Sequence, residues 1–231
     1  MARIAQDDDL LIVNRGGVDY RATVAEVKPP VCELEELPEP PAVSYGIFHI
    51  INPSERLELK EPREGKLTIF DLNGNDLGAR YYVDPSEEII VHVEGSVDLF
   101  ATNFGASWTF GDQTDTSRVL SFYGFFSGCL AFNDDISDWD TSSCTSMRMM
   151  FYNCMSFNQD IGNWNTSKVT SMEDMFSQAG QFNQDLSQWC VSSIDLANNG
   201  NDGFAATGGP FESNTAFHPV WGTCPRGEDT P

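Results

Sequence analysis

The sequence has few basic residues, and this shortage limits the partners that the protein can bind. Its 231 residues include 13 Lys and Arg against 35 Asp and Glu, which gives a formal net charge of −22. Nucleic-acid binding needs clustered Lys and Arg to neutralise phosphates, and an anionic membrane surface attracts the same residues. We therefore expect no nucleic-acid partner and no attachment to anionic lipid.

Long apolar runs and targeting signals are also missing. No segment approaches the roughly 20 apolar residues of a membrane-spanning helix, so we expect no membrane insertion. The start of the chain carries Asp7-Asp8-Asp9 where a signal peptide would have its apolar stretch. These features predict a protein that is made and kept in a cytoplasm until it is assembled.

Enzyme motifs are absent too. The six cysteines form no CxxC pair, and the sequence has no G-x-S-x-G, P-loop, HExxH or dinucleotide-binding string. His49 and His92 fall in β-rich runs, with no Ser, Cys or carboxylate at a motif spacing; His218 is the third histidine. We expect no enzymatic activity, no catalytic residue and no cofactor.

What the sequence does contain is an internal repeat of 25 residues, with no length change between its three central copies. In the copy SFNQDIGNWNTSKVTSMEDMF, residues 157–164 suit an extended stretch, and Thr166-Ser167 offers a helix N-cap. The apolar residues of 169–176 have the spacing of a short helix. One unit cannot bury its apolar face, but stacked units can. The expected repeat core contains Phe132, Trp139, Phe151, Phe157, Trp164, Phe176, Phe182 and Trp189.

The units MFYNCMSFNQDIGNWNTSKVTSMEDMF and FNQDLSQWCVSSI resemble the bacterial surface-protein repeats of the leucine-rich-repeat-like, BspA-type superfamily. The resemblance covers Ser107 to Pro225 and implies a repeat scaffold for surface interaction. The first copy departs from the pattern, because Thr114 stands where Trp is expected. The last copy departs as well, with Ala197, Gly200 and Asn201 at the Met, Met and Phe positions.

Residues 43–106 contain short β-rich runs separated by turn signals such as Asn73-Gly74 and Asp84-Pro85. The runs are Tyr45–Ile51, Lys66–Phe70, Arg80–Val83, Glu88–Val93 and Val97–Phe100. They predict a small antiparallel β module, which is marginal in size for a core of its own. We expect it to pack on the repeats or on a partner.

Residues 1–42 look like an arm that docks on another protein. Leu10–Val13 and Val18–Val24 flank Asn14-Arg15-Gly16-Gly17, a hairpin-turn pattern, and residues 29–41 form a Pro- and Glu-rich linker. A lone hairpin is marginal in water, so we expect it to bind a partner. The docking residues would be Leu10, Leu11, Val13, Arg15, Val18 and Tyr20.

The string DDDLLIVNRGGVDYRATVAEV in this arm resembles the start of several virion structural proteins of tailed phages that infect marine cyanobacteria. The resemblance implies other virion proteins as partners and the virion as the location.

Two sets of polar residues leave alternatives open. The aligned Asp135, Asp160 and Asp185 could bind a structural Ca²⁺, although hydrogen bonds to turn backbone are the simpler interpretation. Cys129 and Cys154 occupy equivalent positions and could form a disulfide, with two buried thiols as the favoured alternative. Cys144 stands at a Val position and is expected in the core. Cys190 and Cys224 could tie the C-terminal segment to the last copy.

The fold class expected is mainly β with short helices. It comprises the arm (1–42), the small antiparallel β module (43–106) and a leucine-rich-repeat-like solenoid with a C-terminal cap (107–231). The expected function is that of a phage virion structural protein, docked by its arm and present in many copies or as a homo-oligomer. It would serve as capsid decoration or as a tail or fibre contact with a host-surface glycan or protein.

Two alternatives remain. The first is a bacterial cell-surface adhesin of the same repeat family. The second is a polysaccharide-cleaving spike, which needs two carboxylates about 5–10 Å apart in a groove. Asp134 and Asp135 would be its candidates.

Overall fold

The computed structural model describes residues 10–15, 18–23, 35–36, 44–59, 65–78, 80–95, 106–198, 200–225 and 227. The chain divides into two compact units, Met1–Val43 and Ser44–Pro231. Both contain small antiparallel sheets, and the described residues contain few helical turns. The expectation of a mainly β protein is confirmed.

The first unit contains one three-stranded antiparallel sheet. Strands β1 (Leu10–Arg15), β2 (Val18–Thr23) and β3 (Glu35–Glu36) lie in the order β1-β2-β3. Arg15 pairs with Val18, so two residues connect the strands, and the sequence places two glycines there. The predicted pairing of the two runs is confirmed.

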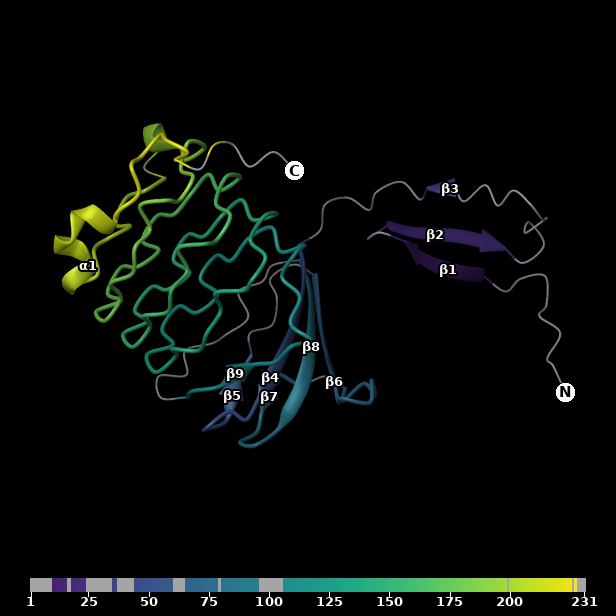
Figure 1. The fold of residues 1–231 in the computed structure, drawn as a ribbon. Coiled ribbons are helices and arrows are strands. Elements are labelled where there is room, and N and C mark those ends of the chain that lie inside the picture. Colours follow the sequence, from purple (N-terminus) through teal and green to yellow (C-terminus); the bar gives the residue numbers. More distant parts are fainter. Residues whose placement is uncertain are drawn as a thin grey trace, which may run out of the picture. The chain divides into compact units, whose positions relative to one another are not determined.

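The second unit begins with a four-stranded antiparallel sheet in the order β6-β8-β4-β9 (Figure 1). Its strands are β4 (Tyr45–Ile51), β6 (Gly65–Phe70), β8 (Glu88–Gly95) and β9 (Thr109–Phe110). Strands β5 (Leu57–Glu58) and β7 (Tyr82–Val83) form a separate pair, so only the end of the predicted run 80–83 is a strand. The predicted run 97–100 lies outside the described residues.

This sheet shares one hydrophobic core with the repeats. Phe48 on β4 is fully buried, and its ring lies 5.0 Å from that of Phe125. The ring of Trp108 lies 5.0 Å from that of Phe132, and Phe110 lies 6.1 Å from the same ring. The sheet module therefore packs on the first copies of the repeat.

Successive copies of the repeat are joined by backbone hydrogen bonds between every second residue. The N–H groups of Phe122, Gly124, Phe126 and Gly128 donate to the carbonyls of Ser146, Arg148, Met150 and Tyr152. Parallel bridges also join Ser121 to Ser146 and Ser146 to Ser171. Figure 1 shows these copies as neighbouring turns of chain, from teal to green.

The helix predicted over residues 169–176 is wrong, because the chain there forms successive tight turns. The Met175 N–H donates to Met172, three residues back, while the N–H groups of Met172 and Phe176 donate to the next copy. Asp174 has φ 53°, which an α-helix cannot contain. Thr166 is not a helix N-cap either, since its hydroxyl donates to the Cys190 carbonyl.

Aromatic rings stack between copies at the repeat spacing. The rings of Phe126 and Phe151 lie 5.5 Å apart and 10° from parallel, and those of Phe151 and Phe176 lie 5.5 Å apart and 7° from parallel. Phe157 and Phe182 form a second stack at 5.8 Å. Such pairs contribute about 0.5–1.5 kcal/mol each beyond area burial.

The last copy shifts register, which corrects the predicted alignment. The Met147 N–H donates to Ser171, whereas the Met172 N–H donates to Gly200, because the chain contains an insertion near η2 (Leu196–Asn198). Gly200 and Asn201 therefore do not replace the Met and Phe positions, and neither does Ala197, which lies within η2. Phe204 (3% exposed) packs in the core instead.

The C-terminal segment covers the last copy. Helix α1 (Pro210–Ser213) places the fully buried Phe211 at 5.0 Å from the Phe182 ring. The last residue of η3 (Thr215–Phe217) accepts a hydrogen bond from the Leu186 N–H.

Candidate interaction surfaces

The predicted docking residues lie on the two paired strands of the first unit. Leu10, Leu11, Val13 and Arg15 belong to β1, while Val18 and Tyr20 belong to β2. The backbone register pairs Val13 with Tyr20 and Arg15 with Val18, so four of the six form two cross-strand pairs.

The predicted core aromatics all lie inside the second unit. Phe132, Phe151, Phe157, Phe176 and Phe182 are fully buried. Trp164 and Trp189 are at most 3% exposed, and each indole N–H donates to a carbonyl of the preceding copy. These rings are not a surface platform for ligands, and Trp139, at 7% exposed, is the one that differs in its contacts.

The aspartate column hydrogen-bonds turn backbone, as the simpler interpretation predicted. Asp135, Asp160 and Asp185 each accept from the N–H two residues on, at 2.9–3.0 Å. Within the described part of the chain, no group of three or more His, Cys, Asp or Glu side chains is placed to hold a metal ion.

A ladder of amide side chains runs along the exposed side of the copies. The Asn133 side-chain oxygen accepts from the Asn158 N–H, and the Asn158 oxygen accepts from the Asn183 N–H, at 2.8 and 2.9 Å. Gln159 and Gln184 each donate to the preceding copy's backbone at 2.8 Å. This ladder ties the copies together and forms a regular, polar, uncharged strip.

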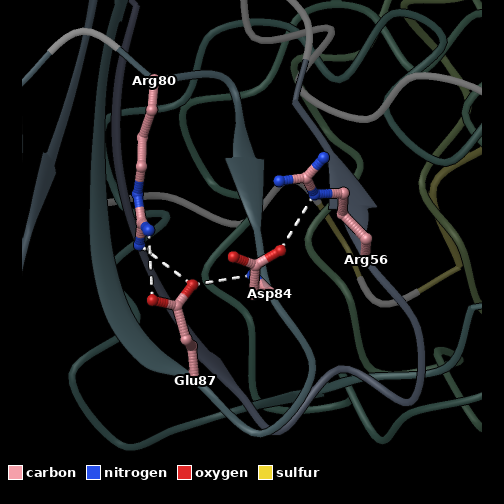
Figure 2. Close-up of polar contacts among 4 residues, drawn as sticks. All are labelled: Arg56, Arg80, Asp84 and Glu87. Carbon is pink, nitrogen blue, oxygen red and sulfur yellow. Dashed lines mark hydrogen bonds and ion pairs between the residues drawn. The ribbon is translucent and has the colours of Figure 1, made fainter.

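A cluster of paired charges lies on the β5–β7 side. Figure 2 shows Arg80 paired with Glu87 through two contacts of 3.1 Å, while Arg56 donates to Asp84 at 2.9 Å. Glu87 also accepts from the Asp84 N–H, and the Arg56 guanidinium lies 3.9 Å from the centre of the Tyr82 ring. The cluster braces the turn before β8, and we assign it no ligand.

The histidines each contact a structural partner. His49 is buried, with Nε2 at 2.9 Å from Glu88 and Nδ1 at 3.7 Å from Asp112. His92 Nδ1 lies 3.1 Å from the Tyr45 hydroxyl, and burial lowers the pKa of this histidine. His218 Nε2 lies 2.7 Å from the Phe211 carbonyl.

The cysteines divide into buried thiols and one disulfide. Cys129, Cys144 and Cys154 are free and fully buried, as the favoured alternative predicted. Burial raises the pKa of the Cys144 thiol to about 12, so this thiol is unreactive at neutral pH. Cys190 and Cys224 form a disulfide between the last copy and the C-terminal segment.

Asp134 and Asp135 have different environments. Asp134 accepts from the Phe110 N–H at 2.7 Å, and partial burial nevertheless raises its pKa. The pKa of Asp135 is lowered, chiefly by the hydrogen bond from the Ser137 N–H. Opposite pKa shifts are typical of acid–base pairs. Here partial burial causes the shift of Asp134, and a hydrogen bond within a turn causes the shift of Asp135.

A pocket of about 370 Å³ lies between the chain after β9 and the following copy. Two hydrogen bonds join its walls: Phe110 N–H to the Asp134 carboxylate, and the Thr116 hydroxyl to the Asp140 carbonyl. Sequence reasoning missed this pocket. Its signal was the small Thr114 at a Trp position, because Thr114 lines the pocket.

Comparison with known families gives a match over part of the chain. Residues 98–207 match a family model described as Mycoplasma protein of unknown function, DUF285. No curated protein and no solved structure matches the chain. Among the described residues, no helix has the length and apolar character to cross a membrane.

Proposed function

We propose that this protein is a phage virion structural protein that docks on the particle through residues 1–42 and presents its repeat domain outward. The supporting observation is the division into a small unit of paired strands and a larger unit with its own core. A sheet as small as the first is marginal alone, so a partner would supply the missing burial.

The presented domain would be a leucine-rich-repeat-like solenoid. Backbone hydrogen bonds between equivalent residues, the parallel bridges at Ser121, Ser146 and Ser171 and the ring stacks support this proposal. Such a scaffold offers a rigid face. Many copies on one particle would bind a host-surface glycan or protein through several weak contacts at once, which together give high avidity.

A bacterial cell-surface adhesin is the second candidate, favoured by the Cys190–Cys224 disulfide. Disulfides persist in oxidising surroundings, which a cell exterior provides and which a released virion also meets. Mass spectrometry of purified particles separates the two candidates, since an adhesin would be found in the cell envelope and not in virions.

The docking role is tested by cross-linking mass spectrometry on purified particles. We expect cross-links from residues 1–42 to another virion protein, and fewer incorporated copies in the variant Val13→Asp/Tyr20→Asp, which changes one cross-strand pair. The matched control is Asn14→Ser/Asp19→Ser at the neighbouring polar pair. Cross-links made solely by residues 44–231, or equal incorporation of both variants, would refute docking by the arm.

A further inference from the structure

The ladder of amide side chains leaves one half of each asparagine amide free for a ligand. Asn133 and Asn158 are exposed, and each side-chain oxygen accepts from a backbone N–H of the next copy, at 2.8 and 2.9 Å. An N–H donor fixes which side of the amide carries the oxygen, so the NH₂ group lies on the other side. Within the described ranges of the chain, nothing accepts a hydrogen bond from either NH₂ group. Each asparagine therefore offers a donor whose position is already fixed.

The glutamines of the ladder add acceptors in the same way. Gln159 and Gln184 each donate from Nε2 to a backbone carbonyl of the preceding copy at 2.8 Å, which holds the side chain in place. Neither Oε1 atom accepts a hydrogen bond from any residue that the structure describes. A side chain that is ordered before a ligand arrives loses less entropy on binding. The ladder thus presents donors and acceptors that are ready for a ligand.

These groups repeat at the spacing of the copies. The rings of Phe132 and Phe157, each one residue before an asparagine of the ladder, lie 6.0 Å apart, and those of Phe157 and Phe182 lie 5.8 Å apart. One sugar unit of an extended polysaccharide has a similar length. Such a polymer can therefore place one unit on each copy, from Asn133 to Asn183.

The charges beside the ladder indicate that this polymer is not an anion. Asp135, Asp160 and Asp185 are exposed two residues beyond the asparagines, and the whole chain has a net charge of −22. Each carboxylate uses Oδ1 to accept from its own turn, which leaves Oδ2 for a further donor. An anionic glycan would be repelled, whereas the hydroxyl groups of a neutral glycan can donate to these oxygens.

The composition of the ladder favours a glycan over a protein partner. Protein interfaces are centred on Trp, Tyr and Arg side chains that become buried in pockets of the partner. The ladder contains none of these residues, and the neighbouring Phe157 and Phe182 are fully buried. Amide and carboxylate groups instead match hydroxyl groups, which both donate and accept hydrogen bonds.

We propose that the amide ladder binds a neutral, extended polysaccharide, with one sugar unit on each copy. Hydroxyl oxygens of the sugar accept from the asparagine NH₂ groups, and its hydroxyl groups donate to the glutamine oxygens and the aspartate carboxylates. This inference deepens the proposed host-surface contact by naming the class of ligand and the face that binds it. It rests on that proposal for its biological meaning.

The binding test uses the full chain and three hexasaccharides in titration calorimetry. Cellohexaose is a neutral, extended β-1,4-linked chain, maltohexaose has the same glucose units in a coiled α-1,4-linked chain, and a hyaluronan fragment carries carboxylates. We expect cellohexaose to bind at least about tenfold more tightly than either of the others, because several hydrogen bonds depend on the spacing and each contributes about two- to tenfold. From glucose to cellotriose, each added unit should tighten binding about two- to tenfold.

The same titrations can contradict the proposal. Equal binding of maltohexaose would overturn it, because the spacing of the copies would then not be recognised. Equal binding of the hyaluronan fragment would overturn the requirement for a neutral chain. If neither cellohexaose nor a β-1,4-linked mannohexaose binds, the ladder is not a polysaccharide site.

Matched variants locate the site. Asn133→Asp/Asn158→Asp keeps the oxygens that accept from the next copy and removes two free NH₂ donors, so it should weaken cellohexaose at least about tenfold. The control Asn163→Asp/Asn165→Asp adds the same charge outside the ladder and installs the residue types that the preceding copy has at these positions. The control should bind cellohexaose almost as the natural chain does, and the two variants should have a similar Tm. An equal loss of affinity in both would mean that added charge, and not the missing donors, weakens binding.

NMR of the natural chain tests the site even if the ladder variant fails to fold. On addition of cellotriose, the side-chain NH₂ signals of Asn133 and Asn158 should shift, and that of Asn153, which is not part of the ladder, should not. Shifts at Asn153 without shifts at the ladder would place the sugar elsewhere and refute the proposal.

Failure of this proposal and failure of the virion proposal give different results. Glycan binding is measured on the isolated protein, whatever particle or cell carries it, and presence in virions is measured by particle composition. A chain found in virions that binds none of the neutral glycans would refute the ladder as a glycan site and leave the virion proposal standing.

Discussion

Two neighbouring aspartates differ in what their charge does to stability. Partial burial raises the pKa of Asp134, so its charged form destabilises the folded state at neutral pH. That cost disappears as the pH falls below the unfolded-state pKa of about 4. Asp134→Asn keeps an acceptor for the Phe110 N–H, so we expect it to raise stability at pH 7 by less than about 1 kcal/mol. Thermal denaturation at pH 7 and pH 3 should show this advantage at pH 7 alone.

Asp135→Asn is the control for that prediction. The Ser137 bond lowers the Asp135 pKa, so the charged form stabilises the fold above the unfolded-state pKa, and this contribution is lost as the pH falls through the folded-state pKa. Asp135→Asn should therefore not raise stability at pH 7. Equal gains for both variants would show that relief of net negative charge, and not burial, governs the effect.

Residue roles were predictable wherever the period alone decides them. Phe157 and Trp164 recur in every central copy and are buried, and Cys144 follows the Val119 and Val169 position into the core. The role of Thr166 was not predictable, because its hydroxyl donates to the next copy and local sequence favours a helix N-cap.

At the level of elements, the predicted helix failed for a physical reason. Apolar residues three apart are typical of a helix face, but successive i to i+3 turns give the same spacing. Val169, Met175 and Phe182 each donate an N–H to the carbonyl three residues earlier, so each turn directs one apolar residue inward. Strands such as β4 were predictable, because runs of β-branched and aromatic residues favour a strand, and successive turns do not give the same pattern.

The disulfide holds the C-terminal segment on the last copy. Beside it, the Val191 N–H donates to the Thr223 carbonyl at 2.8 Å, and the bridge closes a sequence separation of 34 residues. By loop entropy such a bridge stabilises the fold by roughly 3–4 kcal/mol. We expect reductant to lower Tm of the protein, and Cys190→Ser/Cys224→Ser to have the lowered Tm without reductant.

The double variant also provides the control for that experiment. Its Tm should not change on adding reductant, because Cys129, Cys144 and Cys154 are already free. A further drop in the variant would show that reductant acts elsewhere in the chain.

At the scale of the whole molecule, the sequence predicts the modules but not how they join. The period indicates the stack, and the β-rich runs indicate the sheet. The shared core depends on Phe48, Trp108 and Phe110 meeting Phe125 and Phe132, which no local pattern encodes. The pocket was missed for the same reason, since residues of two successive copies line it.

If the repeats form a solenoid, removing one whole copy should leave the rest folded. Deletion of residues 146–170 joins Thr145 to Ser171 and regenerates the Thr-Ser-Met sequence found at both positions. Phe126 would then face Phe176 as it now faces Phe151, because the stacks keep a 5.5 Å spacing. We expect a cooperative unfolding transition with a smaller denaturant m-value, since less surface is exposed on unfolding.

The matched control deletes residues 146–157, about half a copy, and removes fewer residues while breaking the register. Phe151 and Phe157 are lost but Trp164 is kept, so the apolar residues of the remaining half would meet polar ones in the next copy. We expect this shorter deletion to abolish cooperative unfolding, measured by circular dichroism in urea. If the half-copy deletion is tolerated as well as the full one, register between copies does not hold the domain together. If the full-copy deletion unfolds the domain, the copies are not interchangeable units, because the stack then depends on contacts beyond nearest neighbours.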